Sequence, residues 1–156
     1  MTRPITVLLA DDHALVRRGF RRMLEDDAER LQRFTTVLRS LEPALAFHVW
    51  RNAYAMIREA SPFLPTTTLI SLDHDLEPEP GGTDPGDGYM VVQWLVSQPV
   101  IRPVIVHTSN SERSSWMAGA FDLEGWRHYR VAPLGDDWIE SDWRRVVRRL
   151  LKKAHA

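Results

Sequence analysis

The sequence contains no cysteine, so neither disulfide bonds nor thiolate metal sites can form within this chain. Lysine is almost absent as well, because among 20 basic residues only Lys152 and Lys153 are lysines. No apolar run reaches the roughly 18 residues that a membrane-spanning helix needs, and no signal peptide opens the chain. We therefore expect a cytoplasmic protein with no membrane partner.

A strong charge of one sign is also missing. The 20 basic and 21 acidic residues give a formal net charge of −1, which provides no overall field for nucleic acid or an anionic membrane. Basic residues do cluster at positions 17–22 and 144–153. We interpret both clusters as the solvated faces of helices.

The chain does contain a regular alternation of short apolar runs and helical patterns. Apolar runs typical of buried parallel strands lie at residues 5–10, 46–50, 69–72, 104–106 and, more weakly, 129–131. Helical spacing follows these runs at residues 14–41, 53–60, 89–96, 114–121 and 141–153. The 156 residues therefore predict a single α/β domain, a doubly wound five-stranded parallel sheet in the order 2-1-3-4-5.

An acidic doublet after an apolar segment occurs twice near the start of the chain, as Leu8-Leu9-Ala10-Asp11-Asp12 and as Met23-Leu24-Glu25-Asp26-Asp27. Spacing favours the second copy as the end of the first strand, since the intervening elements need roughly 45 residues and Asp27 precedes Asp73 by 46. Strand composition favours the first copy, because the second would place Arg21 and Arg22 near a buried central strand. We favour the first copy, which lengthens the first helix by about four turns and leaves Asp26 and Asp27 solvated.

The predicted site is centred on Asp73-His74-Asp75, which ends the third apolar run. In this sheet order the carboxyl ends of strands one, three and four meet at one edge, where open α/β sheets bind their ligands. Neighbouring carboxylates repel one another, and Mg²⁺ prefers oxygen ligands. We therefore predict a Mg²⁺ site made by Asp11, Asp12, Asp73 and Asp75, with Asp26 and Asp27 as the alternative pair.

Other polar residues at this edge suit proton transfer and phosphate binding. His107 ends the fourth apolar run beside the acidic cluster and is a candidate acid or base, with His74 as a second candidate. Ser109 and Asn110 follow in the same loop and can hydrogen-bond a phosphate oxygen. The alternative is that His107 is a buried histidine hydrogen-bonded by a neighbour, and that Ser109 and Asn110 are ordinary loop and cap residues.

Residues 7–19 resemble the start of the receiver domains of two-component response regulators. That family uses an acidic pair for Mg²⁺, an aspartate that accepts a phosphoryl group, a Thr or Ser, and a Lys-Pro dipeptide. Asp73 and Thr108 match this pattern, whereas Ala132 stands before Pro133 in place of the lysine. The resemblance implies a signalling module phosphorylated on Asp73 by a histidine kinase, or a pseudo-receiver that binds a protein partner. The missing lysine argues against ordinary phosphorelay.

From about residue 25 onward, the chain contains four motifs in this order: Glu25-Asp26-Asp27-Ala28-Glu29-Arg30, Leu72-Asp73-His74-Asp75-Leu76, Asp87-Gly88-Tyr89 and His107-Thr108-Ser109-Asn110. Together they resemble the cyclic-phosphate-processing branch of receiver-like domains, which is associated with RNA repair. This resemblance implies action on a phosphate-containing substrate, a 2′,3′-cyclic phosphate at an RNA end, and it favours Asp26 and Asp27 as the acidic pair. Residues 1–22 then resemble an ordinary receiver start grafted onto, or duplicated in, a different receiver.

Overall fold

A five-stranded parallel sheet forms the centre of the protein. The computed structural model describes residues 6–10, 20–76, 78 and 81–155, and for residues 6–10 and 20–28 it describes the backbone alone. The strands are β1 (Thr6–Ala10), β2 (Ala46–Trp50), β3 (Thr67–Leu72), β4 (Val104–Val106) and β5 (His128–Arg130). Their order is β2-β1-β3-β4-β5, which confirms the predicted topology.

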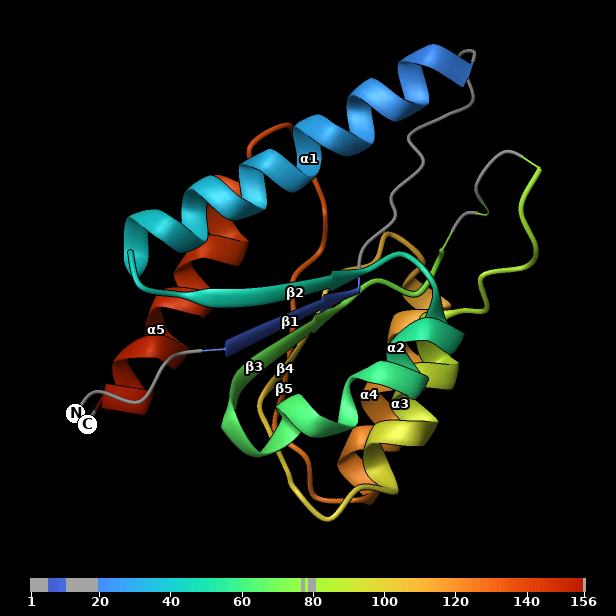
Figure 1. Cartoon of the computed structure of the whole chain (residues 1–156). Coiled ribbons are helices and arrows are strands. Elements are labelled where there is room, and N and C mark those ends of the chain that lie inside the picture. Colours follow the sequence, from blue (N-terminus) through green and yellow to red (C-terminus); the bar gives the residue numbers. More distant parts are fainter. Residues whose placement is uncertain (1–5, 11–19, 77, 79–80, 156) are drawn as a thin grey trace.

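The described residues form five α-helices that flank the sheet: α1 (Phe20–Leu41), α2 (Ala53–Glu59), α3 (Gly88–Val96), α4 (Ser111–Leu123) and α5 (Arg144–His155). A 3-10 helix, Ser61–Thr66, leads into β3, and a π-helical turn, η2 (Ile139–Trp143), leads into α5. Helices α1 and α5 cover one face of the sheet, and α2, α3 and α4 cover the other (Figure 1). The doubly wound arrangement is therefore confirmed. None of the helices in the described part of the chain is long and apolar enough to cross a bilayer.

Both faces of β3 are buried, which explains why the apolar runs are continuous rather than alternating. Ile70 and Leu72 belong to the core beneath α2, α3 and α4, whereas Leu69 belongs to the core beneath α1 and α5. Trp143 is fully buried, and Trp94 packs against the first of these cores while partly exposed. The central strands are thus fixed by packing on two sides.

Two helices begin directly after an asparagine that caps them. Asn52 caps α2, since its side-chain oxygen accepts a hydrogen bond of 3.0 Å from the backbone N–H of Ala55. Helix α4 begins three residues earlier than the apolar spacing predicts, because Asn110 caps it through a 3.1 Å bond from the N–H of Arg113. The last α-helix, predicted from residue 141, begins at Arg144 and is preceded by the π-helical turn Ile139–Trp143.

The structure uses the first of the two acidic segments as its first strand. β1 ends at Ala10 and pairs with both β2 and β3, while the second segment, around Asp26 and Asp27, lies in the 22-residue α1. Strand composition therefore predicted β1 correctly, including the lengthened first helix. The predicted helical residues 14–19 lie outside the described residues.

Candidate active site

Asp73 lies at the carboxyl edge of the sheet, directly after β3. In the paired strands Ala10 is level with Leu72, and Leu72 is level with Val106, so β1, β3 and β4 end together. Asp73 is only 1% exposed, and its Oδ1 accepts a 3.2 Å hydrogen bond from the backbone N–H of Asp75. The structure thus places a buried carboxylate at the tip of the central strand, where the sequence predicts it.

The N-terminus of α3 packs tightly against Asp73 and His74. The N–H of Gly88 donates a 2.8 Å hydrogen bond to the carbonyl oxygen of His74. A Cβ atom at position 88 would overlap the carbonyl oxygen of Asp73 and would lie 2.8 Å from the Cα of His74. Only glycine therefore fits here, which gives the Asp87-Gly88 motif a physical reason.

His74 is buried and held by a carboxylate. Its Nδ1 lies 2.7 Å from Oδ1 of Asp75, and its Nε2 lies 3.8 Å from Oδ2 of Asp87. Asp87 also caps α3, through a 2.9 Å bond from the N–H of Met90. Among the described residues, the buried Nε2 has no hydrogen-bond partner. When the neutral ring donates Nδ1–H to Asp75, Nε2 carries the lone pair that can accept a proton or bind a metal.

His107 is fully buried on the α1 and α5 face. Its Nδ1 lies 2.7 Å from Oγ of Ser71, and that hydroxyl oxygen accepts a 3.0 Å hydrogen bond from Nε1 of Trp143. The imidazole stacks on Trp138 at 5.7 Å between ring centroids and lies 5.5 Å from Phe34. His107 is therefore anchored among aromatic rings beside Asp73.

The sequence contains only a weak signal for this anchoring group. Ser71 is the polar residue among the otherwise apolar residues 69–72 of β3. Its hydroxyl is buried in the structure, and a buried hydroxyl needs a hydrogen-bond partner. Trp138 carries no such signal. The guanidinium of Arg30, from the first of the four motifs, is buried and lies 4.8 Å from the Trp138 ring centroid.

The loop after β4 begins beside the end of β3. The N–H of His107 donates a 2.8 Å hydrogen bond to the carbonyl oxygen of Leu72, the residue before Asp73. Thr108 is buried, and its hydroxyl accepts a 3.2 Å bond from the N–H of Asn110. The side-chain oxygen of Asn110 is used as the cap of α4. Ser109 is exposed. Of the two residues predicted to bind phosphate, Ser109 thus offers the more accessible donor.

The structure leaves the Mg²⁺ prediction without a test. Within the described ranges no group of three or more histidine and acidic side chains is arranged to hold a metal ion. Asp11 and Asp12 lie outside the described residues, and the side chains of Asp26 and Asp27 do so as well. The buried carboxylate of Asp73 beside the end of β1 is nevertheless the kind of hard oxygen ligand that Mg²⁺ takes.

Aromatic and basic side chains lie on α3 and α4 close to this edge. Trp116 is 44% exposed, and the guanidinium of Arg113 lies 3.9 Å from its ring centroid. Tyr89, the neighbour of Gly88, meets Trp116 edge-on at 6.4 Å. Sequence spacing cannot reveal this group, because its members come from two helices that meet only in the folded protein.

The loop and turn that carry Trp138 are fastened to α1 by an ion pair. Nε of Arg33 lies 2.6 Å from Oε1 of Glu140, and Nη2 of Arg33 donates a 2.5 Å bond to the carbonyl oxygen of Asp136. The hydrogen bond from Arg33 lowers the pKa of Glu140 below its usual value of 4.5, and the same bond raises the pKa of Arg33. The pair thus steadies the aromatic group around His107.

Comparisons with known proteins agree with this architecture. A family model described as "Cyclic-phosphate processing Receiver domain" matches residues 21–122. A response regulator receiver domain from Rhodospirillum rubrum has a similar structure, with a TM-score of 0.64, 13% sequence identity and 94% of each chain covered. The phosphorylated cyanobacterial phytochrome response regulator RcpA gives a TM-score of 0.56 at 16% identity, covering 94% of this chain and 91% of its own.

A third structure, the Legionella pneumophila response regulator LqsR, gives a TM-score of 0.54 at 10% identity and covers 97% of this chain and 43% of its own. At such identities the structural likeness establishes the fold alone. No curated protein matches the sequence significantly. The matches confirm the predicted resemblance to receiver domains.

Proposed function

The chain belongs to the cyclic-phosphate processing receiver domain family, and from this premise we propose that it opens a 2′,3′-cyclic phosphate at an RNA end. The observation that carries the proposal is His74, a buried imidazole whose Nδ1 is held by Asp75 and whose Nε2 has no hydrogen-bond partner among the described residues. That nitrogen lies on the residue next to the buried carboxylate of Asp73. A proton acceptor and an oxygen ligand are thus held side by side at the sheet edge.

Hydrolysis of a cyclic phosphate adds one water molecule across one ester bond. The oxygen of the water forms a bond to phosphorus, one bond from phosphorus to a ribose oxygen breaks, and a proton passes to that ribose oxygen. Nε2 of His74 would take the proton from the water and return it to the leaving oxygen. Asp75 would stabilise the protonated ring between these steps.

The remaining residues would bind and position the phosphate. The exposed hydroxyl of Ser109 would donate a hydrogen bond to a phosphoryl oxygen. A magnesium ion held by Asp73 together with an acidic doublet would polarise a phosphoryl oxygen. His107 would act as a positioning residue, since its imidazole is fully buried and its Nδ1 is engaged by Ser71. The exposed ring of Trp116 provides a stacking surface for a nucleobase.

The proposal is tested with purified protein, Mg²⁺ and an oligonucleotide that ends in a 2′,3′-cyclic phosphate. We expect turnover by the wild type and a loss of about 100-fold or more in kcat for His74→Gln, the usual effect of removing a general acid or base. His128→Gln is the matched control. His128 also pairs with an aspartate, Asp122 at 2.7 Å, but it lies at the start of β5, whereas His74 follows the end of β3. Unchanged kcat in His74→Gln would remove the proposed proton carrier, and an inactive wild type would refute the function.

A second candidate function is signalling through phosphorylation of Asp73. It is favoured by the receiver fold and by the burial of Asp73 at the tip of β3. Against it stands Ala132, an exposed residue where receivers carry the lysine. Labelling by acetyl phosphate that Asp73→Asn abolishes, together with no cyclic-phosphate turnover, would favour signalling over catalysis.

A further inference from the structure

The charged side chains of α5 are all basic. Between Trp143 and the end of the helix there is no acidic residue. Four arginines and two lysines, together with Ser141, line a hollow of about 550 Å³: Arg144, Arg145, Arg148, Arg149, Lys152 and Lys153. This set is called the α5 basic face below. It concentrates six positive charges in a protein whose formal net charge is −1.

These charges are poorly compensated. Within the described part of the chain, the ion pairs of the α5 basic face are limited to one, between Arg145 and Asp142. The six residues also form four like-charge pairs spaced four residues apart along the helix, and such pairs destabilise a helix. A helix face that is merely solvated usually mixes both signs of charge. A bound polyanion would relieve the repulsion that this sequence builds into α5.

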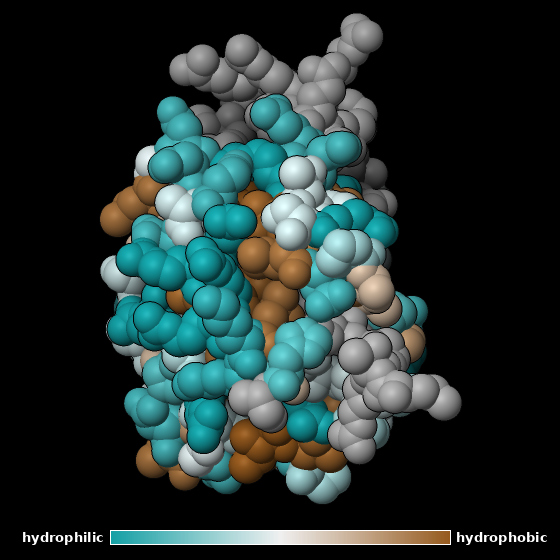
Figure 2. Space-filling model, turned by 90° about the vertical axis from the view of Figure 1, so that its left-hand side faces the viewer, coloured by the Kyte–Doolittle hydropathy of each residue, from teal (hydrophilic) through white to brown (hydrophobic). Residues whose placement is uncertain are grey.

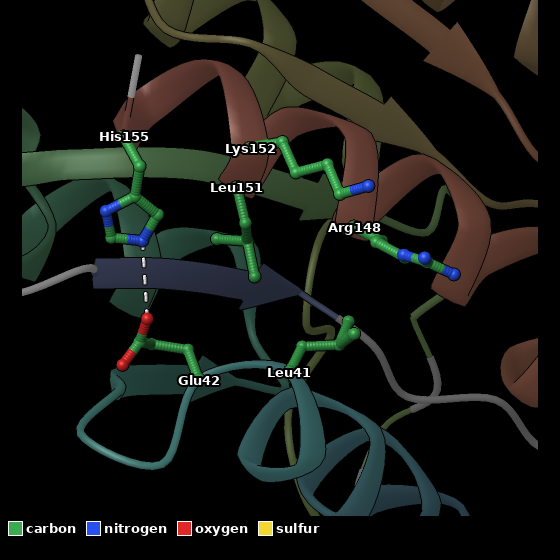
Figure 3. Close-up of a pocket in the computed structure, with 6 residues that line it drawn as sticks. All are labelled: Leu41, Glu42, Arg148, Leu151, Lys152 and His155. Atoms are coloured by element: carbon green, nitrogen blue, oxygen red, sulfur yellow. Dashed lines mark ion pairs between the residues drawn. The ribbon is translucent and has the colours of Figure 1, made fainter.

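The surroundings of the face fit nucleic acid better than a lipid bilayer. The apolar side of α5 is used up in the core, where Val147, Leu150 and Leu151 are buried, so no apolar stripe remains for insertion into lipid. A smaller hollow of about 370 Å³ adjoins the face, with Arg148, Leu151 and Lys152 of α5 on one side and Leu41 and Glu42 on the other (Figure 3). The carboxylate of Glu42 is paired with the ring of His155 at 3.3 Å. Apolar surface beside a row of cations suits a chain that alternates bases with phosphates.

The side of the molecule toward which α5 runs is covered largely by hydrophilic side chains beside a narrow hydrophobic depression (Figure 2). At its start, α5 is tied to the candidate site. Trp143, the residue before Arg144, donates its indole hydrogen bond to Ser71, two residues before Asp73 in β3. From there α5 runs back along the sheet, away from the carboxyl ends of the strands (Figure 1). The α5 basic face therefore leads away from the site across the surface.

We propose that the α5 basic face binds the phosphate backbone of the single-stranded RNA whose cyclic-phosphate end is processed at Asp73 and His74. The inference rests on the proposed function and adds a second contact, remote from the reacting phosphate. Arginine is suited to this role because its planar guanidinium forms two parallel hydrogen bonds to a phosphate. Binding of this kind depends on salt and little on sequence.

The first test measures binding separately from catalysis. The probe is a fluorescent single-stranded RNA with a 3′-hydroxyl end, titrated by anisotropy with the full-length protein at several salt concentrations. We expect Arg148→Gln/Lys152→Gln to reduce the slope of log affinity against log salt by about 1.4, because each single-strand phosphate contact contributes about 0.7. Arg58→Gln/Arg127→Gln, which removes two charges from exposed residues elsewhere, should leave the slope unchanged.

The second test compares turnover of a 2′,3′-cyclic mononucleotide with that of the cyclic-phosphate oligonucleotide. The α5 double variant should raise KM for the oligonucleotide and leave the mononucleotide reaction unchanged. Equal RNA binding by the α5 variant and its control would overturn the inference, and so would binding to phosphatidylserine vesicles in place of RNA. A third outcome separates the two proposals: the α5 variant loses RNA binding, but the wild type turns over neither substrate. That outcome would refute the proposed catalytic function and would still support RNA binding by the α5 basic face.

Discussion

Replacing Gly88 by alanine tests how closely α3 must approach the site. The added methyl group would overlap the carbonyl oxygen of Asp73 and press on the Cα of His74. These neighbours are backbone atoms, so no side chain can rotate out of the way. Either the start of α3 or the segment after β3 must move, and the 2.8 Å hydrogen bond from the N–H of Gly88 to His74 is stretched or lost.

The magnitude follows from these two effects. Overpacking in a tight interior costs about 1–3 kcal/mol, and a backbone hydrogen bond contributes about 0.5–1.5 kcal/mol. Because the chain can relax, we expect Gly88→Ala to lower the free energy of unfolding by about 2–3 kcal/mol. For a domain of this size, that corresponds to a fall in Tm of about 4–12 °C.

Gly119→Ala is the matched control. Gly119 lies in the exposed middle of α4, and a Cβ atom there would meet nothing within 4 Å. The same substitution should therefore raise stability at position 119, by about 0.5–1 kcal/mol, because alanine is the better helix former. Urea unfolding followed by circular dichroism measures both variants. A Gly88→Ala protein as stable as the wild type would refute the close packing of α3 against Asp73 and His74.

Three further predictions concern the buried network, the surface ion pair and the metal. Ser71→Ala deprives two buried ring nitrogens of their partner and should cost about 1–3 kcal/mol in urea unfolding, against about 0.5 kcal/mol or less for an exposed serine. Glu140→Gln should lose about 0.2–1 kcal/mol at neutral pH. That contribution is present above the unfolded pKa of 4.5 and disappears as the pH falls through the lower folded pKa, so variant and wild type should converge in acid. In calorimetry, Asp12→Asn should weaken Mg²⁺ binding and Asp27→Asn should not; the reverse result would assign the metal to the second doublet.

The sheet was predictable because its strands are short, apolar and sharply bounded. The ranges 46–50 and 104–106 agree with the structure to the residue. All three residues of β4 are buried, as a continuous apolar run predicts, whereas β2 is an edge strand that contains His48 and has no fully buried residue. Helix α4 begins three residues before its predicted start, because apolar spacing set that start whereas the helix begins directly after its cap, Asn110, which was also a candidate phosphate ligand. A short polar residue before a helix fits both roles, and sequence alone does not separate them.

The site was predictable in position and less so in orientation. The burial of Asp73 at the sheet edge follows from strand order alone. The environment of His107 depends on Trp143, whose hydrogen bond to Ser71 spans 72 residues of sequence. No local pattern of residues predicts a contact between positions so far apart in the sequence. Two histidines that look equivalent in sequence therefore differ in the structure. His107 is anchored among aromatic rings, whereas Nε2 of His74 has no hydrogen-bond partner among the residues that the structure describes.

The two acidic doublets show why family likeness and strand geometry must be weighed separately. The family match begins at residue 21 and includes Asp26 and Asp27, but those residues lie in α1. The strand position between β2 and β3 is filled by Thr6–Ala10, which precedes the matched region. Ala10, the last residue of β1, is level with Leu72, the residue before Asp73. Strand pairing therefore favours the prediction that Asp11 and Asp12 are the acidic pair of the site, even though sequence similarity covers only the second doublet.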